Sequence, residues 1–314
     1  MATKVNKPVD RLSFINRLKT DMRRHYQVYL IFIPVIIYYI IFHYVPMYGA
    51  IIAFKEYSPG RGIMGSPWVG LTHFTNFFQG MFFKRVLMNT LTVSFSMLFL
   101  GFPAPVILAL LINEVRSKRF ARTVQTITYM PHFVSMVVLC GMIHQFTKDT
   151  GFITMFLTNF GFEQQTMLSN ADLFLPIYVI SGIWQEVGWG SIIYLAALTG
   201  IAPELYEAAK IDGANRWKQV WHITLPGLTP TIITLLIMRV GRVMNIGAEK
   251  VLLLYNPSIY SKADVISTYV YRQGILNASW SSAAAVGLFN SVINLLLLVS
   301  VNKISKSLTE SSLW

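Results

Sequence analysis

The chain has 314 residues, of which 54% are hydrophobic and 13% are charged, and its formal net charge is +12. A soluble domain carries about 25% charged residues, so this composition excludes an ordinary soluble protein and indicates an integral membrane protein. The basic excess lies largely in the amino-terminal tail and in loops, where it matches the negative inner leaflet of a membrane rather than nucleic acid. Cys140 is the single cysteine, which excludes an intrachain disulfide and predicts a small core residue.

Six apolar segments nearly free of charged residues lie along the chain. Each approaches the ~20 residues that a membrane-spanning helix requires. In chain order they cover residues 28–48, 87–112, 124–146, 173–198, 226–245 and 282–302. We therefore predict an all-α integral membrane protein with six transmembrane helices. They form one domain over residues 26–306, between a basic amino-terminal tail (1–25) and a carboxy-terminal tail (307–314).

Two further apolar segments are predicted to lie at the membrane surface rather than to cross it. Residues 62–83 are uncharged but are interrupted by Gly, Pro, Thr, Asn and Gln, so they lack a sustained spanning core. Residues 151–162 are apolar and aromatic, but they are too few to span a bilayer.

The distribution of Lys and Arg predicts the orientation of the chain in the membrane. These residues concentrate before the first apolar segment, between the second and the third, and after the sixth. By the positive-inside rule these regions face the cytoplasm, which places both tails there. The loop at 201–226, with Lys210, Arg216 and Lys218, lies on the same side, whereas the connector between the third and fourth segments carries one basic residue, Lys148.

No motif for catalysis or cofactor binding is found in the sequence. It lacks a G-x-x-x-x-G-K-[ST] phosphate loop, an H-E-x-x-H motif and a G-x-S-x-G motif, and its six histidines are scattered along the chain. We therefore predict no catalytic residue, no metal site and no cofactor in this chain, and we predict that it is not an enzyme. A six-span protein of this kind is a conduit, a receptor or a scaffold.

The polar loop between the fourth and fifth segments, EAAKIDGANRWKQVWHITLP, is predicted to form a helix-turn-helix finger. Pro203 suits the first turn of a helix, Glu207 favours the positive end of its dipole, and Gly213 suits its end, which predicts a helix over residues 203–212. Asn215 is suited to cap a second helix that carries Trp217 on one apolar face. Such a finger suits docking into a groove of a cytoplasmic partner.

The finger carries a motif formed by Glu207, Ala208, Ala209, Gly213, Ile223, Leu225 and Pro226. In residues and spacing this motif resembles the EAA loop of permease subunits of bacterial ABC importers. The segments WVGLTHFTNFF, YMPHFVS and ALTGIAPELYEAAKIDGA are similar to carbohydrate-type permeases. VPMYGAIIAFKEYSP and LLLYNPSIYSKADVISTYVYR resemble the LplB-like branch, which is associated with oligosaccharides from complex polysaccharides.

The resemblance implies a multi-pass permease subunit of the bacterial plasma (inner) membrane. ATP and Mg²⁺ would be bound by two separate ATP-binding subunits, and an extracellular or periplasmic substrate-binding protein would deliver an oligosaccharide. We expect a second permease subunit that is a different chain, and no nucleic acid partner. The residues expected to couple the ATPase subunits to the spans are Glu207, Ala208, Ala209, Gly213, Trp217, Leu225 and Pro226.

Polar and aromatic residues in the fourth and fifth segments are the candidates for a substrate path. They are Gln185, Glu186, Trp189, Arg239, Arg242 and Asn245. A carboxylate in mid-span costs about 2.5–3.5 kcal/mol on insertion, so Glu186 should face a partner or a wet cavity. Arg239 and Arg242 are its candidate partners. The same residues are also compatible with a structural Glu–Arg pair, or with arginines whose side chains reach the outer interface.

Three alternatives remain open from the sequence. Asn290 and Asn294 either line the path or bond a neighbouring helix. The basic residues of the fifth segment allow an acidic cargo, such as a uronate-bearing oligosaccharide. The finger also fits an importer of a non-sugar solute, or a membrane scaffold that recruits a cytoplasmic partner without moving any solute.

Overall fold

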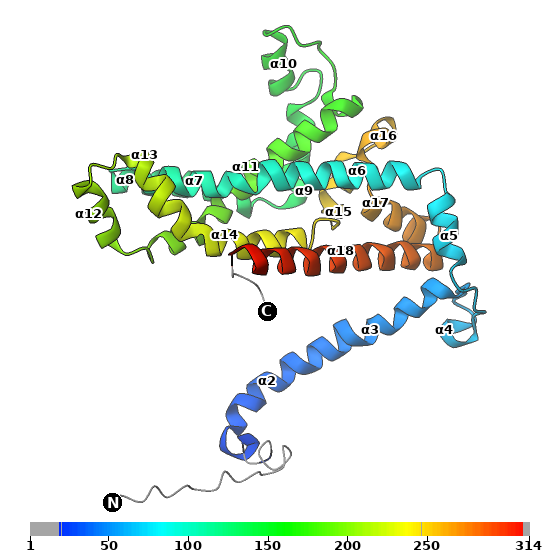
Figure 1. Ribbon diagram of the computed structural model, residues 1–314. Coiled ribbons are helices and arrows are strands. Elements are labelled where there is room, and N and C mark those ends of the chain that lie inside the picture. Colours follow the sequence, from blue (N-terminus) through cyan, green and yellow to red (C-terminus); the bar gives the residue numbers. More distant parts are fainter. Residues whose placement is uncertain (1–18, 20, 246, 310–314) are drawn as a thin grey trace, which may run out of the picture.

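The computed structural model describes residue 19, residues 21–245 and residues 247–309. This part of the chain is helical, and its β-structure is limited to one isolated bridge between Lys55 and Trp68. Figure 1 shows a bundle of long helices, a first long helix that extends away from it, and a short helix that projects from one face. Most of the predicted amino-terminal tail and the last five residues lie outside the described residues.

Four helices of the described chain are long and apolar enough to cross a membrane, namely Tyr26–Phe54, Phe83–Asn113, Arg216–Val240 and Trp280–Ser307. Two bent pairs raise the number to six if each pair is one span. They are Lys118–Phe133 with Met136–Phe146, bent by 98°, and Ala171–Leu198 with Pro203–Ile211, bent by 75°. A helical protein with four to six apolar helices is therefore established.

Several of these long helices change helical type along their length. The first comprises α2 (Tyr26–Tyr39), η1 (Ile40–Tyr44), α3 (Val45–Met47) and η2 (Tyr48–Phe54). The next comprises α6 (Phe83–Ser96), the π-helical turn η3 (Met97–Gly101) and α7 (Pro103–Asn113). Two other long helices keep one helical type, namely α11 (Ala171–Leu198), close to the predicted 173–198, and α18 (Trp280–Thr309), longer than the predicted 282–302.

The prediction of one continuous helix over residues 124–146 is wrong. This segment comprises α8 (Lys118–Tyr129), the 3-10 turn η4 (Met130–Phe133) and α9 (Met136–Phe146). Pro131 has no N–H to donate, which weakens helical hydrogen bonding in η4. Ser135 has an extended backbone, and its hydroxyl accepts from the Val138 N–H at 3.4 Å, so a new helix begins there. Hydropathy merges α8 and α9 into one segment, because it measures how apolar the residues are and not the angle between two helices.

The second helix of the finger and the fifth apolar segment form one continuous helix, whereas the boundary of the loop at residue 226 stays a prediction. α13 (Arg216–Gln219), the π-helical turn η6 (Val220–Thr224) and α14 (Leu225–Val240) follow one another without a break. Pro226 therefore lies inside a continuous helix, and the wider turn just before it accommodates the missing backbone N–H. The helix ends at Val240, so Arg242 and Asn245 lie in the turn that follows it.

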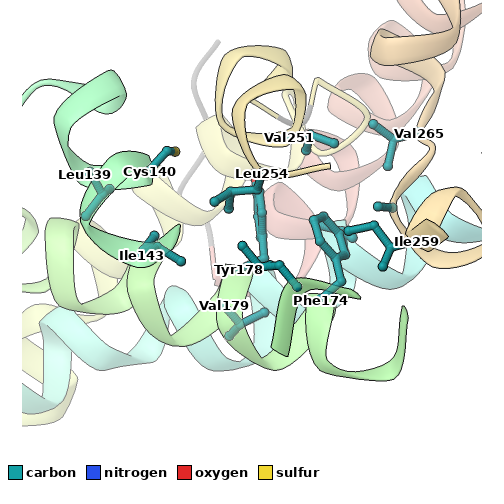
Figure 2. Close-up of a cluster of buried hydrophobic side chains, with 13 residues drawn as sticks. Leu139, Cys140, Ile143, Phe174, Tyr178, Val179, Val251, Leu254, Ile259 and Val265 are labelled. Atoms are coloured by element: carbon teal, nitrogen blue, oxygen red, sulfur yellow. The ribbon is translucent and has the colours of Figure 1, made fainter. Parts of the chain in front are cut away.

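The main hydrophobic core lies where α11 meets α9 and α15 (Ala248–Leu254). Figure 2 shows Cys140, Phe174, Tyr178 and Leu254 among its buried side chains. Cys140 is a buried free cysteine, which confirms the prediction of a core residue. By contrast, no residue of α2 is buried, and Figure 1 shows this helix extending away from the bundle.

The two segments predicted at the membrane surface form only short helices. Residues 62–83 contain α4 (Gly62–Gly65) and α5 (Thr72–Gln79), and residues 151–162 contain α10 (Phe152–Thr158). At 1.5 Å per residue none of them can cross a bilayer. Their lack of a spanning helix is thus confirmed, whereas their position at the membrane surface stays a prediction.

A buried ion cluster joins the start of α6 to the chain before α18. Asp264, with 0% exposure, accepts hydrogen bonds from Arg272 at 2.7 and 3.1 Å and from Arg85 at 3.1 Å. Burial lowers the pKa of Arg272, but the hydrogen bonds and the charge of Asp264 outweigh this effect and hold that pKa above its usual value. The cluster fixes η8 (Arg272–Leu276) and α17 (Ile266–Tyr271) against α6.

Candidate functional site

The helix-turn-helix finger has the predicted local structure. Its first helix is α12 (Pro203–Ile211), and Gly213 follows with a φ of +74°, a conformation that side chains disfavour. Ala214 N–H donates to Ala209 O at 2.8 Å and Gly213 N–H donates to Lys210 O at 3.1 Å, the paired bonds of a Schellman end. Asn215 Oδ1 accepts from Lys218 N–H at 2.9 Å and caps α13. Figure 1 shows α12 and α13 together at one end of the bundle.

The finger exposes large apolar side chains among its charged residues. Trp217 and Trp221 are 74% and 62% exposed, and Leu205 and Ile211 are exposed beside them. Among the predicted coupling residues, Glu207, Ala208, Gly213, Trp217 and Pro226 are exposed, whereas Ala209 and Leu225 are half-buried. Exposed apolar side chains gathered on a projecting element are typical of a protein–protein contact.

Side-chain contacts of Tyr206 and Arg216 hold the finger to the bundle. The Tyr206 hydroxyl is 3.0 Å from the Thr224 hydroxyl, which ties α12 to the helix that continues into α14. Arg216 Nη1 is 3.5 Å from a carboxylate oxygen of Glu114, at the end of α7. A displacement of the finger would therefore be passed to two of the long helices.

Two of the predicted path residues on α11 pack against the break between α8 and α9. Gln185 is 5% exposed and donates to Val134 O at 3.3 Å, so it is a packing residue and does not face a cavity. The ring of Trp189 stacks on His132 of η4, with centroids 4.5 Å apart and an interplanar angle of 2°. A Cβ built on Gly188 would lie 2.0 Å from Thr128 O, so α8 approaches α11 closely at this glycine.

The proposed pairing of Glu186 with an arginine is wrong. The basic side chain beside it is His132, whose Nδ1 lies 3.3 Å from Glu186 Oε2 without the alignment of a hydrogen bond. His132 was missed because sequence reasoning treated every histidine as isolated. Its signal is the adjacent Pro131, which places it at a break inside an apolar segment.

Two adjoining cavities lie between η3, α11 and the end of α14. The first, of about 250 Å³, is lined by Tyr178, Arg239, Arg242 and Asn245, among others. The second, of about 290 Å³, is lined by Glu186, Arg239 and Arg242, among others. Met97 also lines both. Four of the six predicted path residues therefore meet at these cavities, whereas Gln185 and Trp189 do not line them.

The cavities carry an excess of positive charge. Within the described residues, no carboxylate lies within 4.0 Å of Arg239 or Arg242. Glu186 is the acidic side chain lining the second cavity, and its side chain is 54% exposed. An anionic group that enters would find two guanidinium groups that form no ion pair within 4.0 Å, with Glu186 as the single carboxylate in the lining of the second cavity.

The two asparagines of α18 bond to the turn after α14. Asn290 Nδ2 and Asn294 Nδ2 donate to Asn245 Oδ1 at 2.7 and 3.1 Å, and Met244 N–H donates to Asn294 Oδ1 at 3.1 Å. Of the two roles left open by the sequence, the geometry supports the bonding of a neighbouring segment. These bonds hold Asn245 at the edge of the first cavity.

Residues 101–310 match the family described as "Binding-protein-dependent transport system inner membrane component". Protein LplB of Bacillus subtilis (strain 168) is 45% identical over 93% of this chain and 92% of its own length. The polygalacturonan/rhamnogalacturonan transport system permease protein YteP of the same organism is 42% identical over 95% of this chain and 93% of its own length.

Two solved structures are also similar to this chain. A bacterial ABC transporter involved in the import of the acidic polysaccharide alginate has a TM-score of 0.87 and 43% identity, and covers 93% of this chain and 99% of its own. A bacterial alginate ABC transporter in complex with an alginate pentasaccharide-bound periplasmic protein has a TM-score of 0.87 and 42% identity, and covers 95% of this chain and 100% of its own.

Proposed function

Because the chain belongs to the family of inner membrane components of binding-protein-dependent transport systems, we propose that it forms the path for an acidic oligosaccharide released from a complex polysaccharide. The chain is a multi-pass permease of the sugar ABC importers, as its relatives at 45% and 42% identity support. The observation that carries the acidic cargo is the pair of cavities lined by Arg239 and Arg242, neither of which has a carboxylate partner within the described residues. A solved transporter at 43% identity imports an acidic polysaccharide, which supports the same cargo chemistry.

The partners follow from the family and from surfaces that this chain leaves uncovered. The exposed tryptophans of the finger suit docking on ATP-binding subunits, which would hold ATP and Mg²⁺. The uncovered α2 suits contact with a second permease subunit, which we expect to be a different chain. A substrate-binding protein supplies the oligosaccharide, as the solved transporter with its periplasmic protein supports.

Transport then proceeds by alternating access. Closure of the ATP-binding subunits moves the finger, and its contacts with Thr224 and Glu114 pass this movement to the long helices. The cavities around Arg239 and Arg242 open first to the outside and then to the cytoplasm. Coupling of this kind requires that ATP and cargo each favour one of two states.

The experiment that tests the cargo is ATP hydrolysis by the complete complex in lipid discs, with its substrate-binding protein, over a panel of neutral and acidic oligosaccharides. We expect uronate-bearing oligosaccharides to stimulate hydrolysis and neutral ones of the same length to stimulate it less. Arg242→Gln should reduce the stimulation by acidic sugars, with Lys303→Gln, on the far part of α18, as the control.

Three results would contradict this assignment. Stimulation by neutral sugars alone would remove the acidic cargo but keep the sugar importer. Stimulation by a solute of another class would favour an importer of a non-sugar solute. An assembled complex that moves no solute would favour a membrane scaffold.

A further inference from the structure

Lys250, on α15, is a buried cation that the proposed function does not yet use. It is 5% exposed, its Nζ donates to Tyr178 O at 3.0 Å, and it lies 4.7 Å from the centre of the Tyr178 ring. Within the described residues no carboxylate lies within 4.0 Å of this ammonium group. A buried ammonium group without a counter-ion is costly, so an anion that enters beside Lys250 would be bound favourably there.

The ammonium group contacts the stretch of α11 that lines both cavities. Tyr178, to which it is bonded, lines the first cavity, and Gly182, one turn further along α11, lines the second. A Cβ built on Gly182 would lie 3.3 Å from Lys250 Nζ and 3.2 Å from Met97 Cε. Gly182 has no side chain of its own, and the ends of Met97 and Lys250 both reach the space that a side chain at this position would fill.

Met97 is suited to be a movable part of the lining of both cavities. Its unbranched side chain has three rotatable bonds and adapts readily to different surroundings. It is also the first residue of η3, and π-helical turns inside longer helices are frequent at functional sites. Rotation of Met97 would expose the ammonium group to the cavities at Gly182.

We propose that Lys250 is a specificity-determining residue of the path, whose ammonium group binds a carboxylate of the cargo beside Arg239 and Arg242 when Met97 moves aside. This inference rests on the proposed function, because it assigns a third cation to the same cavities. Lys250 then selects uronate-bearing oligosaccharides over neutral ones during passage, after the substrate-binding protein has made its own selection. Its hydrogen bond to Tyr178 keeps the ammonium group in place until the cargo arrives.

A purely structural role for Lys250 requires a different side-chain chemistry from the binding of a cargo carboxylate. The bond to Tyr178 O needs a donor, which Gln supplies, whereas binding of a carboxylate needs a positive charge, which Arg supplies. Met supplies neither but fills similar space. The variants Lys250→Gln, Lys250→Arg and Lys250→Met therefore separate the two roles.

The test uses the complete complex in proteoliposomes, loaded through its substrate-binding protein with alginate pentasaccharide or with its partly carboxyl-reduced form. The measured quantity is the ratio of the two uptake rates. Loss of a charged partner inside a protein is expected to lower the rate for the acidic sugar by about tenfold or more in Lys250→Gln and Lys250→Met. The ratio should fall accordingly and should recover in Lys250→Arg.

Two glycine variants give an independent readout. Gly182→Ala places a methyl group against Met97 and Lys250 and should lower the same ratio, whereas Gly141→Ala, where an added Cβ meets nothing within 4 Å, should not.

An unchanged ratio in Lys250→Gln, or an equal loss for both sugars, would overturn the inference. If the unmodified complex takes up a neutral sugar but neither of these two sugars, the proposed function fails, because the cargo is then not acidic.

Discussion

Gly213 decides the geometry of the finger at the residue scale. Its φ is +74°, its N–H is bonded to Lys210 O at 3.1 Å, and an added Cβ would meet nothing within 4 Å. The cost of a side chain there is therefore conformational, about 1–2 kcal/mol for Ala. Proline costs more, because it fixes φ near −65° and removes the N–H that closes the helix end.

We predict that Gly213→Pro abolishes the stimulation of ATP hydrolysis by cargo while Gly213→Ala retains most of it. The measurement is hydrolysis by the assembled complex with and without loaded substrate-binding protein. Gly62→Pro is a matched control, because Gly62 has a φ of +65°, an N–H bonded to Pro59 O at 3.3 Å, and open space around an added Cβ. Normal stimulation in Gly213→Pro would remove this glycine from the coupling.

The path residues show what single positions in a sequence can and cannot predict. Arg239, Arg242 and Glu186 line a cavity, and an ionisable residue in an apolar segment needs such a polar surrounding, whereas their role in a substrate path stays a prediction. Gln185 and Trp189 were predicted beside them from type alone, yet they pack against Val134 and His132. Successive residues of a helix point in different directions, and the partner of each depends on helix crossings that one sequence does not reveal.

At the scale of elements, the crossing of α8 and α11 is the feature that sequence reasoning missed. Hydropathy predicted one spanning segment over residues 124–146, whereas this region holds two helices bent by 98°. α11 holds this break through Gln185, Glu186 and Trp189, and through the close approach of Gly188 to Thr128 O. The second, fourth and sixth apolar helices begin within a few residues of the predicted starts, because length and composition determine them, whereas the fifth begins at Arg216 rather than at residue 226.

We predict that Gly188→Ala destabilises the permease strongly. A Cβ at this position would lie 2.0 Å from Thr128 O, so α8 and α11 would have to separate, and overpacking of this kind costs about 1–3 kcal/mol or more. The measurement is the midpoint of thermal unfolding of the purified complex in detergent. Gly141→Ala, with nothing within 4 Å of the added methyl, should be neutral or slightly stabilising. Equal midpoints for the two variants would show that the crossing tolerates a wider spacing.

At the scale of the whole molecule, the surfaces left uncovered fall in separate places. The finger exposes Trp217 and Trp221 at one end of the bundle, and α2 exposes apolar residues along its whole length. The cavities with Arg239 and Arg242 lie between the long helices, away from both. In this arrangement the proposed cargo contacts lie between the long helices, and the finger and α2 remain as two separate surfaces for other subunits.

The uncovered α2 gives the last prediction. Cys140 is buried, so a cysteine placed on α2 can be labelled selectively with a photocrosslinker. Val35 and Tyr39 lie one turn apart along one groove of this helix, and we expect Val35→Cys and Tyr39→Cys to crosslink to the second permease subunit in the assembled complex. The crosslink should be absent when the chain is expressed alone. Crosslinking to lipid only, in the assembled complex, would show that α2 faces the bilayer and that another surface joins the two permeases.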